Sequence, residues 1–213
     1  MTPGAVVFDM DGVLVDSGAH HRAAWEALLG DLGVPVPPEF WRRTIGRPAG
    51  EAVAALLERA LAAGEAHELS RRKHAHYVRL SRGGLPAVRG AVAYLATLEK
   101  AGVPCAVATS ARRVDATSLL GGLGLLAHFR AVVAAEDVRR GKPDPEVYRL
   151  AARGVGVAAG RCLVFEDSLV GVHAARAAGM RVIGLTTAHT EAELRAAGAE
   201  RAIADFEGLA WPP

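Results

Sequence analysis

The chain carries Ala5-Val6-Val7-Phe8-Asp9-Met10-Asp11-Gly12 close to its start, and this segment sets the architecture. Four consecutive apolar residues without polar alternation predict a short strand covered on both faces, as in a parallel sheet. Two acids follow where the strand ends, and that edge of an α/β sheet is where ligands bind. Because residues i and i+2 of an extended segment point the same way, Asp9 and Asp11 are expected to face one spot, with Gly12 allowing a sharp turn.

Apolar runs of the same kind recur later in the chain, separated by segments with helical periodicity. The further expected strands are Cys105–Ala108, Ala131–Ala134, Cys162–Phe165, Val182–Leu185 and, more weakly, Ala202–Ala204. The expected helices between them are about Ala91–Lys100, Asp115–Leu120, Pro145–Arg153 and Ser168–Ala178, the last with Ser168 as its N-cap. This alternation predicts an α/β fold, a doubly wound parallel sheet with a Rossmann-like core and helices on both sides.

One stretch interrupts the alternation directly after the first strand. Helical periodicity runs through Ala19–Leu29, Glu51–Ala63 and His67–Leu80, and no strand pattern lies among them. We therefore expect a small all-helical domain of residues 17–85, inserted into a catalytic core formed by residues 1–16 and 86–213.

Composition excludes several classes of protein. The 213 residues are 51% hydrophobic, which is too apolar for a disordered chain, and no run approaches the roughly 18 uncharged apolar residues of a membrane span. The net charge of +2 indicates no nucleic-acid surface, and two cysteines cannot form a disulfide framework, so both are expected to be buried thiols. The N-terminus lacks a basic signal-peptide region, and a cytoplasmic protein is expected.

Polar side chains follow or lie near the ends of three more expected strands. Thr109 and Ser110 follow the second strand, Lys142 lies between Gly141 and Pro143 before a helix, and Glu166 and Asp167 end the fourth strand. Each group also has an ordinary explanation: hydroxyls cap helices, lysines occupy surfaces, and acids favour helix N-termini. Taken together, up to four carboxylates face one lysine, and an excess of negative charge of this kind favours a divalent cation such as Mg²⁺, which can bridge to a phosphate.

These segments resemble the four motifs of the haloacid dehalogenase-like hydrolases, in the right order and spacing over nearly the whole chain. The first motif is similar to residues 8–17, the second to Thr109, the third to Lys142 in Gly-Lys-Pro-Asp-Pro, and the fourth to residues 165–168 with the glycine-containing helix that follows. The helical insert resembles the cap of the branch that contains β-phosphoglucomutase and small-metabolite phosphatases.

The resemblance implies a magnesium-dependent phosphatase. Asp9 would attack phosphorus and form an aspartyl-phosphate, and Asp11 would protonate the leaving oxygen and then activate water. Thr109 and backbone N–H groups near Ser110 would hold the phosphoryl oxygens, and Lys142 would offset charge. Mg²⁺ would be held by Asp9, by the main-chain carbonyl of Asp11 and by Asp167, with Glu166 binding directly or through water.

The substrate is expected to be a small phosphorylated metabolite, with sugar phosphates, phosphoglycolate, glycerol phosphate and nucleotide monophosphates all open. His21 and Arg47 in the insert and Arg112 after the second motif are the expected substrate-binding side chains, together with Ser110. A phosphomutase of the β-phosphoglucomutase type is the alternative, but it uses a hydroxyl–lysine–amide trio where this chain has Ala111, Arg112 and Arg113.

A non-enzymatic alternative is a phosphorylated receiver-like module, which also combines a parallel sheet with acids, a hydroxyl and a lysine. Its phosphoacceptor lies on a middle strand, and it has no helical insert after the first strand. No interface patch can be recognised in the sequence, and a monomer or weak homodimer is expected, with no nucleic-acid or membrane partner.

Overall fold

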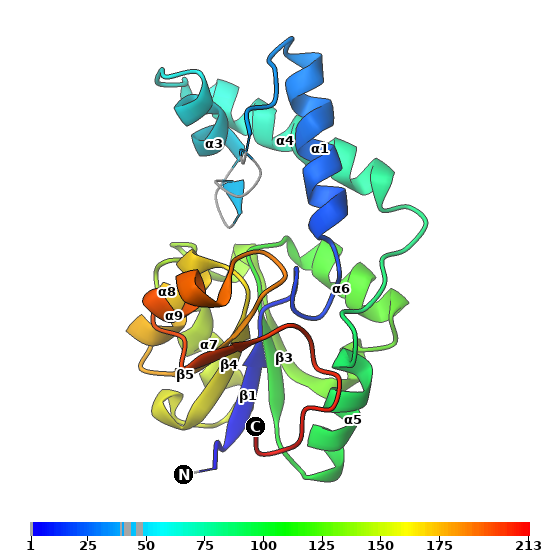
Figure 1. The fold of residues 1–213 in the computed structure, drawn as a ribbon, viewed down its shortest axis with the longest axis vertical. Helices are drawn as coiled ribbons and strands as arrows, with labels where there is room; N and C mark the ends of the chain where they lie inside the picture. Colours follow the sequence, from blue (N-terminus) through cyan, green and yellow to red (C-terminus); the bar gives the residue numbers. More distant parts are fainter. Residues whose placement is uncertain (1, 39, 41–43, 46–48) are drawn as a thin grey trace. The chain divides into compact units, whose positions relative to one another are not determined.

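The computed structural model describes residues 2–38, 40, 44–45 and 49–213. The chain divides into two compact units, one formed by Met1–Asp16 with Leu85–Pro213 and the other by Ser17–Gly84. The first unit is an α/β sandwich and the second is helical (Figure 1). None of the helices within the described ranges is long and apolar enough to cross a membrane.

The core unit contains a six-stranded sheet in which every pair of neighbours is parallel. Its strands are β1 (Ala5–Phe8), β2 (Cys105–Ala108), β3 (Phe129–Val133), β4 (Cys162–Glu166), β5 (Arg181–Leu185) and β6 (Arg201–Ile203). They lie in the order β3-β2-β1-β4-β5-β6. The predicted doubly wound parallel sheet is therefore confirmed, and the central strands β1 and β4 are apolar throughout except for Glu166 because both their faces are covered.

Helices cover the two faces of this sheet. Figure 1 shows α5 (Ala91–Lys100) and α6 (Arg113–Gly122) on the opposite side from α7 (Glu146–Val155), α8 (Leu169–Ala177) and α9 (Glu191–Ala196). Three short 3₁₀ turns join elements, at Leu126–His128, Ala135–Asp137 and Ala159–Arg161. Sequence analysis did not predict α9, although its N-terminus carries a capping box in which Thr190 and Glu193 bond to each other's backbone N–H groups.

The two faces of the sheet are packed differently. Small aliphatic side chains of α7, α8 and α9 fill one face, with Val7, Ala106 and Val164 among the strand residues beneath them. Aromatic rings fill the other face, where Phe8 and Phe165 stack with centroids 5.4 Å apart. Their neighbours in this aromatic cluster are Tyr94, Phe129 and Phe206. The rings fix the two strand residues that directly precede Asp9 and Glu166.

The helical unit has a small core of its own. The helices among its described residues include α1 (Gly18–Asp31), α3 (Ala49–Leu56) and α4 (Ala63–Leu80), and Trp25, Leu28, Leu29, Phe40 and Val53 are among the side chains of its core. The predicted helix 51–63 is wrong at its end, since α3 stops at Leu56 and the chain turns through Glu58 with a φ of 49°. Leu57 and Leu61 then pack against the core, so tertiary packing overrides a sequence that favours helix.

The chain leaves and re-enters the core unit along two adjacent segments. Asp16 N donates to Pro86 O at 2.9 Å, and Val88 N donates to Leu14 O at 3.0 Å. Val15 and Ala87 form an antiparallel bridge between these two bonds. The exit and the return are therefore pinned side by side within the core unit.

Candidate active site

The strand order places two acidic segments at the centre of the sheet. Winding reverses between β1 and β4, which is the point where doubly wound sheets open a crevice at their carboxyl edge. Phe8 pairs with Phe165 in the β1–β4 ladder, and Asp9 N donates to Phe165 O at 3.0 Å. Asp9 and Glu166 thus leave neighbouring strands at the same level.

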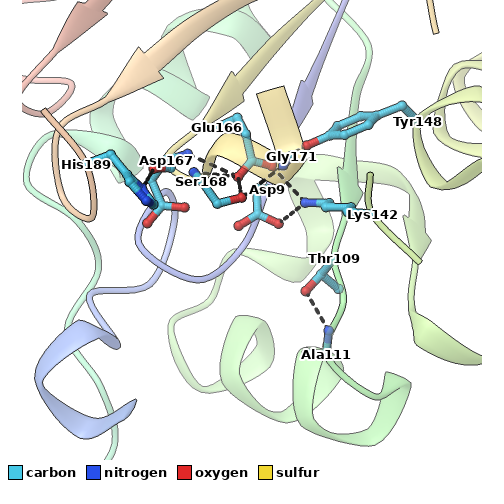
Figure 2. A network of polar contacts seen from close by, with 10 residues as sticks. All are labelled: Asp9, Thr109, Ala111, Lys142, Tyr148, Glu166, Asp167, Ser168, Gly171 and His189. Carbon is cyan, nitrogen blue, oxygen red and sulfur yellow. Dashed lines mark hydrogen bonds and ion pairs between the residues drawn. The ribbon is translucent and has the colours of Figure 1, made fainter. Parts of the chain in front are cut away.

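Lys142 connects these two acids. Its Nζ lies 2.6 Å from Asp9 Oδ1 and 2.8 Å from Glu166 Oε2 (Figure 2). The lysine side chain is 4% exposed, against 10% for Asp9 and 0% for Glu166, so the three groups interact with little solvent screening. The lysine comes from the turn before α7, and the paired charges make a buried ion-pair network rather than a surface contact.

Glu166 is held by five donors. Its Oε1 accepts from Ser168 Oγ at 2.7 Å, Ser168 N at 2.9 Å and Asp167 N at 3.2 Å. Its Oε2 accepts from Lys142 Nζ and from the hydroxyl of Tyr148. Ser168 also caps α8, as predicted, by accepting from Gly171 N at 3.1 Å. Five donors exceed the roughly four lone-pair sites of a carboxylate, so the acceptor capacity of Glu166 is filled.

Asp167 sits against the turn that follows β1. A Cβ added at Gly12, whose φ is +74°, would lie 2.0 Å from Asp167 Oδ2, so this carboxylate needs glycine beside it. Thr187 Oγ1 lies 2.7 Å from Gly12 O and 3.2 Å from Asp167 Oδ2, and His189 Nδ1 lies 2.9 Å from Asp167 O. Thr187 and His189 follow β5 and hold Asp167 from the side opposite Lys142 (Figure 2 shows His189).

Burial and crowding shift the pKa values of the acids in opposite directions. Burial and the Glu166 carboxylate raise the pKa of Asp9 to about 7, although Lys142 acts against them. Burial and the charges of Glu166 and Asp9 raise the pKa of Asp167 well above its usual range. Burial would also raise the pKa of Glu166, but Lys142 and its other donors outweigh it and hold the value below normal.

The lysine itself stays charged. Burial disfavours its ammonium, but Asp9 and Glu166 together raise the pKa of Lys142 well above its ordinary value. At neutral pH the Lys142–Glu166 pair is therefore ionised, whereas burial and crowding favour the protonated forms of Asp9 and Asp167. A bound cation would displace these protons and stabilise the ionised form of both carboxylates.

The donor set fits Mg²⁺. Asp9, Glu166 and Asp167 each offer a carboxylate oxygen, and these three atoms lie within 4.8 Å of one another. Hard oxygen ligands of this kind suit Mg²⁺. Because Glu166 already holds five donors, Asp9 and Asp167 are the carboxylates that can approach a cation.

The other predicted core residues follow strands β1 and β2. Asp11 is half-buried in the turn after β1 and its charge acts on Asp9. Thr109 is buried at the end of β2, beside β1, with its Oγ1 accepting from Ala111 N at 3.0 Å. Ser110 is exposed, and Arg112 pairs with Asp115 of its own helix at 2.9 Å.

The predicted substrate-binding residues of the insert belong to the helical unit. His21 stacks on Tyr77 with ring centroids 4.1 Å apart, and its Nδ1 lies 2.7 Å from Lys73 Nζ. Arg47 lies outside the described residues. Both remain predictions.

Three residues at the site were not predicted from the sequence: Tyr148, Thr187 and His189. A weak signal existed for the last two, because they follow an expected strand at the same sheet edge as Asp9. Tyr148 lies inside a helical pattern and carried no signal of its own.

Comparison with known proteins gives a consistent result. A family model described as haloacid dehalogenase-like hydrolase matches residues 3–179. The chain is 36% identical over 206 residues to the validoxylamine A 7'-phosphate phosphatase of Streptomyces hygroscopicus subsp. limoneus, covering 97% of this chain and 95% of that protein. It is 35% identical to the fructose-1-phosphate phosphatase YqaB of Escherichia coli strain K12, covering 84% of this chain and 94% of that protein. A solved hydrolase from Pseudomonas syringae matches with a TM-score of 0.86 at 32% identity, covering 97% of this chain and 94% of that one.

Proposed function

The chain belongs to the haloacid dehalogenase-like hydrolases, and from this membership we propose that it hydrolyses small phosphorylated metabolites, sugar phosphates foremost, in a Mg²⁺-dependent reaction. It is a phosphoric monoester hydrolase, and relatives named as phosphatases of phosphorylated carbohydrates support the substrate class. The observation that carries the proposal is the buried Lys142 held between Asp9 and Glu166, with Asp167 beside them.

Asp9 is proposed as the nucleophile. Its carboxylate would attack phosphorus, the bond from phosphorus to the ester oxygen would break, and Asp11 would protonate the departing alkoxide. Asp11 would then take a proton from water as the water attacks the aspartyl-phosphate, which releases inorganic phosphate and restores Asp9. Asp11 lies two residues after Asp9 in the turn that follows β1, and this proximity supports a shared part for the two carboxylates in the reaction.

Lys142 and Thr109 are proposed to stabilise the charge that develops on the phosphoryl oxygens. The two carboxylates beside Lys142 raise its pKa, so it would meet the phosphoryl group as an ammonium. Thr109 is buried at the end of the strand next to β1, where its hydroxyl and the N–H groups after it can face the same anion.

Mg²⁺ would be held by Asp9, Asp167 and the main-chain carbonyl of Asp11. When bound, the cation would neutralise negative charge on the phosphoryl group and orient that group. Glu166 would then serve chiefly to anchor Lys142, because its five donors leave it little capacity for a direct metal bond. A cytoplasmic location and a monomer or weak homodimer remain predictions.

The test is phosphate release from an aryl phosphate with Mg²⁺ and with chelator, comparing the natural protein with Asp9→Asn. Asp31→Asn is the matched control, because Asp31 is an exposed acid of the helical unit. Release that requires Mg²⁺ and disappears only in Asp9→Asn is expected, and a panel of sugar phosphates then ranks substrates. Full activity in Asp9→Asn contradicts the nucleophile, and conversion of β-glucose 1-phosphate to glucose 6-phosphate without release identifies the mutase alternative.

A further inference from the structure

Tyr148 lies behind the lysine–acid pair and touches both of its members. Its hydroxyl donates to Glu166 Oε2, the same oxygen that receives Lys142, and the Lys142 Nζ lies 5.0 Å from the centroid of its ring (Figure 2). The side chain is fully buried on the first turn of α7, six residues after the lysine. One phenol therefore contacts the anion through its hydroxyl and the cation through its ring face.

A lysine ammonium needs such contacts to be held in one place. Its four-carbon side chain is flexible, and its three donors have no fixed directions. Glu166 supplies one fixed point, but Glu166 is itself oriented by the donors on its two oxygens. With the ring of Tyr148 against Nζ, the direction that remains for the ammonium is toward Asp9 Oδ1, 2.6 Å away.

We infer that Tyr148 is a positioning residue for the reaction: it fixes the Glu166 carboxylate and the Lys142 ammonium, so that Lys142 stays directed at Asp9. The kinetic part of the inference rests on the function proposed above. The geometric part does not, because it concerns the Lys142–Asp9 separation in the protein without substrate.

The variant that tests it is Tyr148→Phe, which removes the hydroxyl and keeps the ring. Tyr94→Phe is the matched control, since Tyr94 is also buried and its hydroxyl has no hydrogen-bond partner within the described part of the chain. Loss of one hydrogen bond to a charged group is expected to lower kcat about tenfold in Tyr148→Phe. KM should stay within about twofold in both variants, and kcat should be unchanged in Tyr94→Phe.

Two kinetic results would overturn the inference. An unchanged kcat in Tyr148→Phe would mean that the hydroxyl positions nothing. A fall in kcat together with a rise in KM and an equal loss of thermal stability would mean that Tyr148 only supports the fold. A second measurement tests the route: in a Glu166→Gln background, Tyr148→Phe should cause no further loss of kcat, and additive losses would contradict action through Glu166.

The geometric measurement keeps the inference separate from the proposed function. In a crystal structure of Tyr148→Phe, the Lys142 Nζ–Asp9 Oδ1 separation is expected to increase from 2.6 Å to beyond hydrogen-bond range, about 3.5 Å. It should stay short in Tyr94→Phe. If the natural protein hydrolyses no phosphate ester, this separation alone tests whether Tyr148 positions Lys142. An unchanged separation in Tyr148→Phe refutes the positioning role.

Discussion

Glu166 and Asp167 are neighbours in sequence, yet the same acid-to-amide substitution should affect them in opposite ways. Glu166 is ionised and saturated with donors, whereas burial and neighbouring charges raise the pKa of Asp167 well above its usual range. In the metal-free protein, Asp167→Asn removes a carboxyl whose surroundings disfavour its charge. Glu166→Gln removes a buried charge that pairs with Lys142.

The expected loss for Glu166→Gln follows from its contacts. A glutamine must direct its NH₂ either at Lys142 and Tyr148 or at the two N–H groups and the hydroxyl around Oε1, so donor meets donor in both orientations. Gly171 of α8 packs closely against this carboxylate, since a Cβ added there would lie 2.0 Å from Glu166 Cδ, so the side chain has little room to move on that side. Breaking a buried ion pair on one side costs about 3–5 kcal/mol of the free energy of unfolding. Asp167→Asn removes a charge that its surroundings disfavour, so it should change the free energy of unfolding by less than about 1 kcal/mol.

The free energy of unfolding is measured by urea denaturation at pH 7 in the presence of chelator, with circular dichroism as the signal. Amide hydrogen exchange of β4 reports the core unit separately, since the two units need not unfold together. A loss below about 1 kcal/mol in Glu166→Gln, or equal losses in both variants, would refute the view that Glu166 is an ionised anchor while the surroundings of Asp167 disfavour its charge. Mg²⁺ binding provides the converse readout, because Asp167→Asn should abolish it.

Three other outcomes are expected at the metal side of the site. Gly12→Ala places a Cβ 2.0 Å from Asp167 Oδ2 at a residue whose φ is +74°. The affinity for Mg²⁺, measured by titrating activity with the metal, should fall at least about tenfold. An unchanged affinity would contradict the close packing of Gly12 against Asp167. The raised pKa of Asp9, about 7, means that Mg²⁺ must displace a proton below that pH, so its affinity should rise as pH goes from 6 to 8. Calorimetry in buffers of different ionisation enthalpy should detect the released proton. An affinity for Mg²⁺ that falls as the pH rises would contradict the raised pKa of Asp9. Thr187→Val should lower the affinity for Mg²⁺ about 10–100-fold, because Thr187 contacts Asp167. Thr186→Val, at the exposed neighbouring residue, should leave the affinity unchanged. Equal effects of the two substitutions would show that Thr187 does not support Asp167.

The strands and their terminal acids could be predicted from sequence because both depend on local pattern. Continuous apolar runs mark strands covered on two faces, and the carboxyl ends of parallel strands meet at one edge. That reasoning was enough to expect Asp9, Lys142, Glu166 and Asp167 near one another, and the structure places them so.

The roles within the acid pair could not be separated in the same way. Nothing in the order Glu166-Asp167 indicates which carboxylate accepts five donors, since this depends on where α7 and α8 bring Tyr148 and Ser168. The end of α3 was predicted wrongly for a related reason. Residues 57–62 favour helix locally, and the helix ends early because Leu57 and Leu61 pack against the helical core.

The paired exit and return of the chain at Asp16 and Pro86 have a consequence for how such a protein can change. The helical unit is attached through a gap that one hydrogen bond already spans, so a turn of a few residues would close it without shifting β1 or the segment leading to α5. Insertions, deletions or exchanges of the helical unit at this junction are therefore expected to leave the parallel sheet and its buried ion pair intact. The sequence of the helical unit can then change without a matching change in the sheet.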